Sequence, residues 1–118
     1  MGESSIGKFR KEREAQNALV MKYAGRTVRK FYNVDMNAYK AGALDLKTKE
    51  MLGLVASFVL RCDDCILYHL DRCREEGATD REVEEALAVG LVVGGSITIP
   101  HLRRALRAWD DMKRSRAV

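Results

Sequence analysis

The fold is decided by residues 61–73, which read RCDDCILYHLDRC and hold all three cysteines and one of the two histidines of the chain. In an α-helix each residue advances about 100°, so the three cysteines and His69 fall within an arc of roughly 80°. Cys65 and His69 are four residues apart and are therefore neighbours on that face. A neighbouring imidazole can accept the proton of a thiol or stabilise the thiolate, which is the form that attacks.

The Cys-x-x-Cys pair stands where this helix begins. We expect the helix to run from about residue 63 to residue 76, with Gly77 ending it. The partial positive charge at a helix N-terminus favours a thiolate on Cys62 or Cys65. Because the two thiols lie one turn apart, the first can be oxidised by a substrate and the second can then close a disulfide. The pair, with a histidine one turn further on, favours thiol redox chemistry.

The preceding segment, residues 46–60, is predicted to be another helix, with Asp45 as its N-cap. It is apolar almost all round, so we expect it at the centre of the core. Glu50 lies on this helix, 12 residues before Cys62. On one straight helix the two residues would stand about 18 Å apart and could not meet.

Glu50 comes near the histidine if the chain turns back close to Arg61. A single helix over residues 46–76 would be unusually long for a globular domain, so we expect two antiparallel helices with Glu50 within reach of His69. A carboxylate there would fix the tautomer of the imidazole, as orienting groups do in catalytic triads. The alternative is an ordinary surface glutamate in the second turn of its helix.

The rest of the chain also indicates helices. We expect one over residues 8–32, a break around 33–35 and a short helix over 37–43. Thr79 and Glu82 form a capping box for a helix over 80–93, Gly94 and Gly95 end it, and Pro100 opens a last helix that reaches about residue 114. With no convincing strand, the sequence predicts an all-α fold of five or six helices. Residues 1–118 make one domain, with an N-terminal helical extension (about 1–35) and a core (about 37–112).

The composition of the chain limits the classes of partner and the compartment that we expect for it. The net charge is +4 and the cations interleave with acidic residues, and no recognition motif accompanies them, so we expect no nucleic-acid partner. The longest mostly apolar run, residues 51–60, is too short to span a bilayer, and no apolar signal opens the chain, so we expect a cytoplasmic protein with no membrane partner. In that compartment, closely spaced cysteines are more often catalytic or metal-binding than structural disulfides.

The spacing Glu50–x11–Cys62–x2–Cys65–x3–His69 is followed by Gly-Ala-Thr before a capped helix with EALAVG, and then by Gly-Gly. This pattern resembles the AhpD-like (alkyl hydroperoxidase D-like) branch of the carboxymuconolactone decarboxylase family, over roughly residues 37–112. The resemblance implies an all-α homotrimer or homohexamer that reduces hydroperoxides, with a thiol or dithiol protein as the reductant. It implies that Cys65 attacks the peroxide, that Cys62 closes the disulfide, and that His69 and Glu50 belong to the proton relay.

One position departs from the family pattern. Well-characterised members have a histidine just before the second cysteine, and here that residue is Asp64. An acid there opposes thiolate formation by like-charge repulsion, so we expect a shorter relay or a weaker peroxidase. Cys73 lies outside the pattern and is expected to be a buried structural thiol. We expect His101 to be structural or at a subunit contact, and Tyr68 and Trp109 to be packing residues.

Three other interpretations remain at this stage. The spacing C-x2-C-x3-H-x3-C is close to a zinc knuckle, but ligands strung along about 16 Å of one straight helix cannot surround one ion. We therefore expect no metal and no other cofactor. Decarboxylation or lactone chemistry, which the family name suggests, has no specific support in these residues. The third interpretation is a non-catalytic oligomeric module in which the cysteines serve as small buried hydrophobes.

Overall fold

Six α-helices make up most of the part of the chain that the structure, a computed structural model, describes, which is residues 5–116. They are α1 (Ser5–Tyr23), α2 (Arg26–Ala38), α3 (Leu46–Val59), α4 (Asp63–Glu75), α5 (Asp80–Gly94) and α6 (Ile99–Arg116), with a short 3-10 helix, η1 (Ser96–Thr98), between the last two. No strand occurs among these residues. The predicted all-α fold of five or six helices is confirmed.

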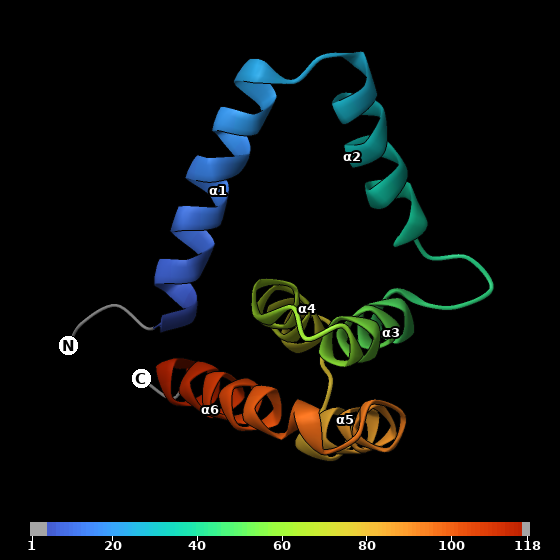
Figure 1. Ribbon diagram of the computed structural model, residues 1–118, viewed down its shortest axis with the longest axis vertical. Coiled ribbons are helices and arrows are strands. Elements are labelled where there is room, and N and C mark those ends of the chain that lie inside the picture. The colour runs from blue at the N-terminus through green and yellow to red at the C-terminus, as the bar shows by residue number, and fades with distance from the viewer. Residues whose placement is uncertain (1–4, 117–118) are drawn as a thin grey trace.

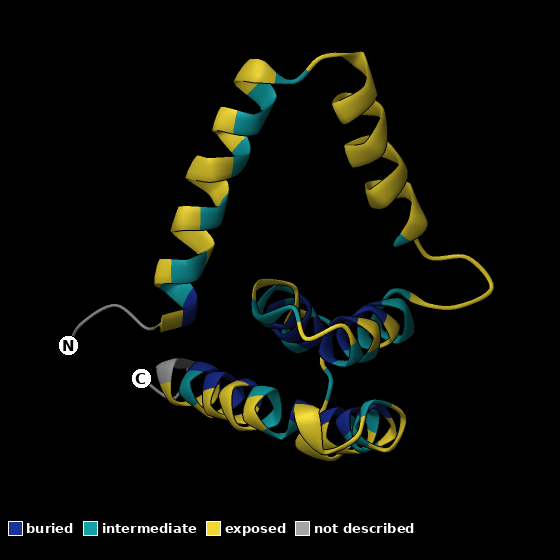
Figure 2. Cartoon of the chain, in the orientation of Figure 1, coloured by how far each residue is buried: buried dark blue, intermediate teal, exposed yellow. Residues whose placement is uncertain are grey.

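The core lies between α3, α4, α5 and α6, which form the lower layer of the molecule (Figure 1). Each of these four helices turns a dark, buried face toward the others (Figure 2). Burying large apolar side chains in this way is the main stabilising contribution to a domain of this size. The largest fully buried side chains are Phe58, Leu54, Ile66, Leu70, Leu87 and Met112.

The chain reverses between α3 and α4, where the sequence predicts the turn. Arg61 has a φ of 59°, in the left-handed region that non-glycine residues rarely adopt. The amide of Cys62 donates to the carbonyl of Ser57 at 3.0 Å, which closes the end of α3. Because the turn is so tight, the two helices lie side by side, and side chains near the start of α3 face the middle of α4.

The predicted helix caps are also present. Asp45 Oδ1 accepts the amide hydrogen of Thr48 at 2.8 Å and caps α3. Thr79 and Glu82 form both hydrogen bonds of the capping box that opens α5. Gly77 and Gly95 have φ values of 83° and 80°, so both helix-ending glycines occupy a conformation in which a side chain would be strained.

The N-terminal prediction was wrong in its boundaries. The break falls at residues 24–25 instead of 33–35, and residues 39–45 form no helix where a helix over 37–43 was expected. Gly25 is the N-cap of α2 with an extended backbone and no side-chain cap, so no capping residue marks the boundary. At the other end, Lys49 Nζ donates to the carbonyls of Ala38 and Lys40 at 3.0 and 2.6 Å. The end of α2 is therefore set by a tertiary contact with α3, which the local sequence around residue 38 does not reveal.

The first two helices rise from the four-helix layer like two sides of a triangle (Figure 1). The base of α1 is fixed to the layer by Ile6, which is buried, and by Arg10, whose guanidinium binds both carboxylate oxygens of Asp71 on α4 at 2.9 and 2.5 Å. In contrast, α2 has no buried residue, and it is exposed along its length (Figure 2). Within the described residues, no helix is long and apolar enough to cross a membrane.

Candidate functional site

The Cys-x-x-Cys pair forms the beginning of α4. Cys62 is the N-cap residue, and its sulfur accepts the backbone N–H of Cys65 at 3.4 Å. The two sulfur atoms are 2.6 Å apart, and both residues are free thiols. A disulfide bond is about 2.05 Å long, so only a small movement separates the pair from a bonded state. The arrangement suits a reversible dithiol–disulfide exchange.

The neighbourhood of Cys65 opposes its ionisation. The hydrogen bond with Cys62 raises the pKa of the Cys65 thiol to about 11, with burial and the charges of Cys62 and Asp64 acting in the same direction. Arg13 on α1 acts in the opposite direction. Because the thiolate is the attacking form, Cys65 depends on a nearby base at neutral pH. Asp64 thus has the unfavourable influence that its charge suggests.

A buried carboxylate–imidazole pair lies one turn further along α4. His69 Nδ1 is 2.8 Å from Glu50 Oε1, and the two residues are only 8% and 2% exposed. The second oxygen of Glu50 accepts from Arg72 Nε at 3.5 Å. Glu50 is therefore a core residue, and the alternative of a surface glutamate is wrong. A buried carboxylate is tolerated when it is paired in this way.

Tyr39 is a member of this cluster that the sequence did not reveal. Its hydroxyl oxygen lies 3.4 Å from His69 Nε2, the ring nitrogen opposite the one that faces Glu50. The two rings also pack together, with their centroids 5.3 Å apart. Tyr39 follows α2 and lies 30 residues before His69, in a segment for which a helix was expected. No motif or periodic spacing links the two positions.

A cleft between α1, α2 and α4 leads to the cysteines. It has a volume of about 520 Å³, and Cys65, Tyr68 and His69 line its α4 side. From α1, the guanidinium of Arg13 lies 3.9 Å from the centre of the Tyr68 ring, in the geometry of a cation–π contact. Cys65 is exposed toward this space and Cys62 is more covered.

A second cleft, of about 610 Å³, adjoins the first. Tyr39 and Glu50 lie in its wall, and Arg13, Tyr32 and Tyr68 line both clefts. Tyr39 therefore lines a cleft that adjoins the one lined by Cys65.

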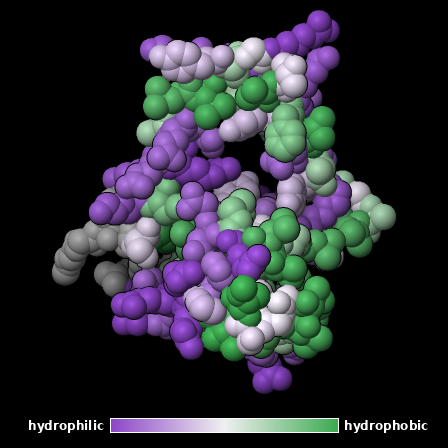
Figure 3. All heavy atoms as spheres, in the orientation of Figure 1, coloured by the Kyte–Doolittle hydropathy of each residue, from purple (hydrophilic) through white to green (hydrophobic). Residues whose placement is uncertain are grey.

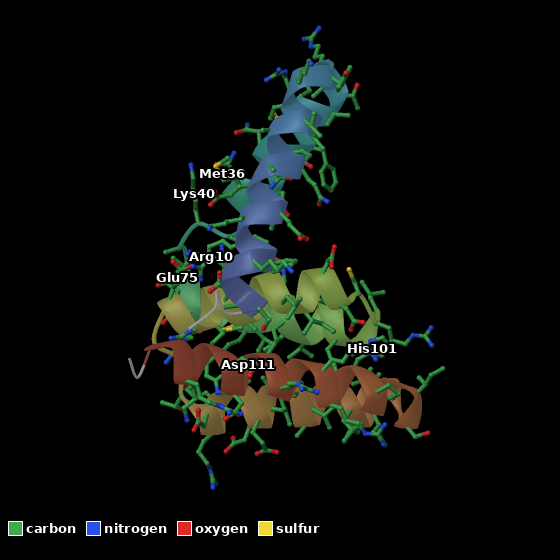
Figure 4. All side chains as sticks on the ribbon, turned by 90° about the vertical axis from the view of Figure 1, so that its left-hand side faces the viewer. Arg10, Met36, Lys40, Glu75, His101 and Asp111 are labelled. Atoms are coloured by element: carbon green, nitrogen blue, oxygen red, sulfur yellow. The ribbon has the colours of Figure 1, made fainter. Side chains whose placement is uncertain are left out.

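Three further residues named in the sequence analysis, Cys73, His101 and Trp109, do not line either cleft. Cys73 is fully buried in the core, and burial raises its pKa to about 12, so it is an inert thiol at neutral pH. His101, labelled on α6 in Figure 4, pairs with Asp63 on α4, with 2.7 Å between Nδ1 and Oδ1. Trp109 is buried and its Nε1 donates to Asp80 Oδ1 at 2.8 Å. Among residues 5–116, no group of three or more histidine, cysteine or acidic side chains could hold a metal ion.

Comparison with known proteins gives a consistent picture. The model of the carboxymuconolactone decarboxylase family matches residues 25–108. A protein of Thermotoga maritima is 51% identical, with a TM-score of 0.91 over 93% of this chain and 96% of its own. A second crystal structure of the same protein was solved under the description of a carboxymuconolactone decarboxylase family protein, with a suggested part in the antioxidative response.

Two more distant relatives extend the picture. A carboxymuconolactone decarboxylase family protein of Legionella pneumophila is 27% identical, with a TM-score of 0.82 over 90% of this chain and 95% of its own. An uncharacterised protein of the cox locus of Paracoccus denitrificans is 32% identical over 71 residues. That match spans 60% of this chain and 64% of the Paracoccus protein.

The tight packing around His69 leads to a prediction about Gly53, which lies one turn after Glu50 on α3. A Cβ at this position would lie 2.6 Å from both His69 Cε1 and the Tyr39 hydroxyl oxygen. Alanine normally stabilises a helix by about 1 kcal/mol relative to glycine, but overpacking costs about 1–3 kcal/mol. We therefore expect Gly53→Ala to lower the free energy of unfolding by about 1 kcal/mol, measured by urea denaturation.

Gly42→Ala is the control, because the nearest atom to a Cβ there is Lys49 Nζ at 3.9 Å, an ordinary contact distance. It should leave stability nearly unchanged. A Gly53→Ala protein as stable as the wild type would show that the His69–Tyr39 contact is not tightly packed.

Proposed function

Because the chain belongs to the carboxymuconolactone decarboxylase family, in its AhpD-like branch, we propose that it is a peroxidase of the peroxiredoxin-like kind. It reduces hydroperoxides through a disulfide cycle between Cys62 and Cys65. The observation that carries the proposal is the placement of two free thiols 2.6 Å apart, one of them facing a cleft that is also lined by His69, the partner of the buried Glu50. The antioxidative part suggested for the Thermotoga relative agrees with it.

The first step oxidises Cys65. Its thiol gives up a proton to the relay of His69 and Glu50, and the sulfur attacks one oxygen of the hydroperoxide. The O–O bond breaks, Cys65 becomes a sulfenic acid, and the thiol proton ends on the leaving oxygen to give an alcohol, or water from hydrogen peroxide. Cys65 is the favoured attacker because it is the exposed thiol of the pair and lines the cleft.

The second step closes the disulfide. The sulfur of Cys62 attacks the sulfur of Cys65, the S–O bond breaks, and the thiol proton of Cys62 leaves with the hydroxyl as water. A thiol or dithiol protein then reduces the disulfide by two exchange steps and is itself oxidised. We place this cycle in the cytoplasm, where such reductants are maintained.

Glu50 sets the tautomer and the orientation of the His69 imidazole. A carboxylate that accepts from Nδ1–H holds a neutral imidazole in the tautomer whose Nε2 carries no hydrogen and can accept a proton. The pair is buried, so water does not compete for the hydrogen bond between Glu50 and His69. This arrangement meets the need of Cys65, whose pKa near 11 leaves almost no thiolate at neutral pH.

The proposal is tested by consumption of tert-butyl hydroperoxide with dithiothreitol as the reductant. We expect Cys65→Ser to lose activity by at least about 100-fold, because no nucleophile remains. Cys62→Ser, assayed without dithiothreitol, should consume one equivalent of hydroperoxide and end as the Cys65 sulfenic acid, because no partner closes the disulfide. Cys73→Ala is the matched control, since that thiol is buried away from the cleft, and it should remain active. Equal activity in all four proteins would sink the proposal.

We further propose that the chain works as a homo-oligomer, with a trimer or a hexamer as the expected state. Phe31, Val34 and Met36 on α2 are 69%, 65% and 64% exposed, and an unsupported helix of 13 residues is only marginally stable in water. Exposed apolar side chains also gather on α3 and α5, at the lower right of Figure 3. They include Leu52, Val89, Val92 and Val93 on these helices and Leu60 at the C-cap of α3.

Neighbouring copies of the chain would cover both apolar surfaces, because a contact between unlike surfaces forms a ring when its rotation closes. Light scattering coupled to size-exclusion chromatography measures the mass. We expect the wild type to be oligomeric and Phe31→Asp to shift it toward the monomer, whereas Lys30→Asp, the neighbouring polar position, should not. A monomeric wild type at micromolar concentration would contradict the proposal.

A further inference from the structure

We propose that Tyr39 is a member of the proton relay beside His69: its hydroxyl orients the imidazole and carries protons between Nε2 and the reacting atoms. This inference rests on the peroxidase proposed above and adds a member to its relay. The relay then draws on three parts of the chain, namely the residue that follows α2 (Tyr39), the start of α3 (Glu50) and the middle of α4 (His69).

The first argument is that both ring nitrogens of His69 are engaged. Nδ1 faces Glu50 Oε1 at 2.8 Å and Nε2 faces the Tyr39 hydroxyl at 3.4 Å. A carboxylate only accepts, so Nδ1 carries the hydrogen and Nε2 accepts from the phenol. Among the described residues, Tyr39 is the group bonded to the nitrogen that must receive a proton from Cys65. The phenol oxygen is therefore placed to pass a thiol proton to Nε2.

The second argument is that hydrogen bonds from α3 fix the backbone on both sides of Tyr39. Lys49 Nζ donates to the carbonyls of Ala38 and Lys40, on either side of Tyr39 along the chain. Lys49 directly precedes Glu50 on α3, so one helix end positions both partners of His69. Gly53, on the same helix, leaves the space in which the phenol and the imidazole meet, because any side chain there would strike both.

The third argument concerns the protonation of the phenol. Burial, reinforced by the negative charge of Glu50, raises the pKa of Tyr39. Asp35 on α2 and Tyr68 and Cys65 on α4 act in the same direction. Tyr39 therefore keeps its hydrogen at neutral pH and is a donor to Nε2.

The proton transfer balances without any further reactant. As the Cys65 thiol ionises, the phenol oxygen takes up its proton and releases its own to Nε2, so that His69 becomes charged while Tyr39 remains a phenol. After the O–O bond breaks, the sequence runs in reverse and delivers the proton to the leaving oxygen. Since Tyr39 lines a cleft that adjoins the one lined by Cys65, one bridging water suffices where the phenol and the sulfur do not touch.

The test compares Tyr39→Phe with the wild type by two readouts. Nitrogen-15 NMR of the imidazole rings is tractable because the chain has only two histidines, and His101→Gln assigns them. We expect the Nε2 resonance of His69 to shift in Tyr39→Phe, because the hydrogen bond is lost. Tyr68→Phe is the matched control for this signal: its ring contacts His69 edge-on, with centroids 5.1 Å apart, and it should leave the Nε2 resonance in place.

The kinetic readout is single-turnover oxidation of Cys65 by tert-butyl hydroperoxide as a function of pH. We expect Tyr39→Phe to be slower by about 100-fold near pH 7. The difference should shrink as the pH rises toward the raised pKa of Cys65, about 11, because a thiol that is already ionised needs no base. The charged groups that set this profile are Cys62 at the N-cap of α4, Asp64 on α4 and Arg13 on α1. Lys49→Met, which releases the two carbonyls, should reproduce part of both effects.

The outcomes separate the two proposals. A wild type that does not reduce the hydroperoxide overturns the proposed function, and with it the part of Tyr39 in turnover. An active wild type with an equally fast Tyr39→Phe protein overturns the inference alone, as does an unchanged Nε2 resonance. A rate loss of the same size at all pH values also overturns it, because a merely structural effect would not disappear when Cys65 ionises.

Discussion

Glu50 is a carboxylate inside a small protein, and its burial constrains the structure around it. Removing a charged group from water is costly unless it gains partners, and Glu50 has two, His69 and the guanidinium of Arg72. Both partners lie on α4, whereas Glu50 lies on α3. The two helices must therefore run close together in a fixed register. The tight turn at Arg61, with its left-handed backbone, sets that register and places the cysteines directly after it.

The same constraint organises the approach to the site. α3 presents Lys49, Glu50 and Gly53 along its first turns, and these three residues respectively hold the end of α2, bind His69, and leave room for Tyr39. α1 reaches the cleft from the other side and is fixed at its base by Arg10 and Asp71. The site thus combines a well-packed lower layer with two helices that stand over it and bury few residues within one chain.

Much of the fold and part of the site could be predicted from the sequence, namely the features that depend on residues close together in the chain. Asp45, Thr79 and Gly77 mark helix ends because capping depends on neighbouring residues. The approach of Glu50 to His69 followed from one further assumption, a reversal near Arg61. The boundary between α1 and α2 was missed because Gly25 has no capping side chain. Tyr39 was missed because its contact with His69 spans 30 residues and depends on where α2 ends, which Lys49 determines through tertiary contacts.

The central claim is that Cys62 and Cys65 form a reversible disulfide when the protein meets a hydroperoxide. Trypsin should cut after Arg61 and after Arg72, which isolates a peptide of residues 62–72 that holds both cysteines and excludes Cys73. Mass spectrometry of this peptide, after one equivalent of tert-butyl hydroperoxide and quenching with an alkylating agent, tests the claim most directly. The account predicts loss of two hydrogen atoms with no alkylation, and two alkyl groups after treatment with dithiothreitol. A peptide that carries two alkyl groups both before and after peroxide would contradict it.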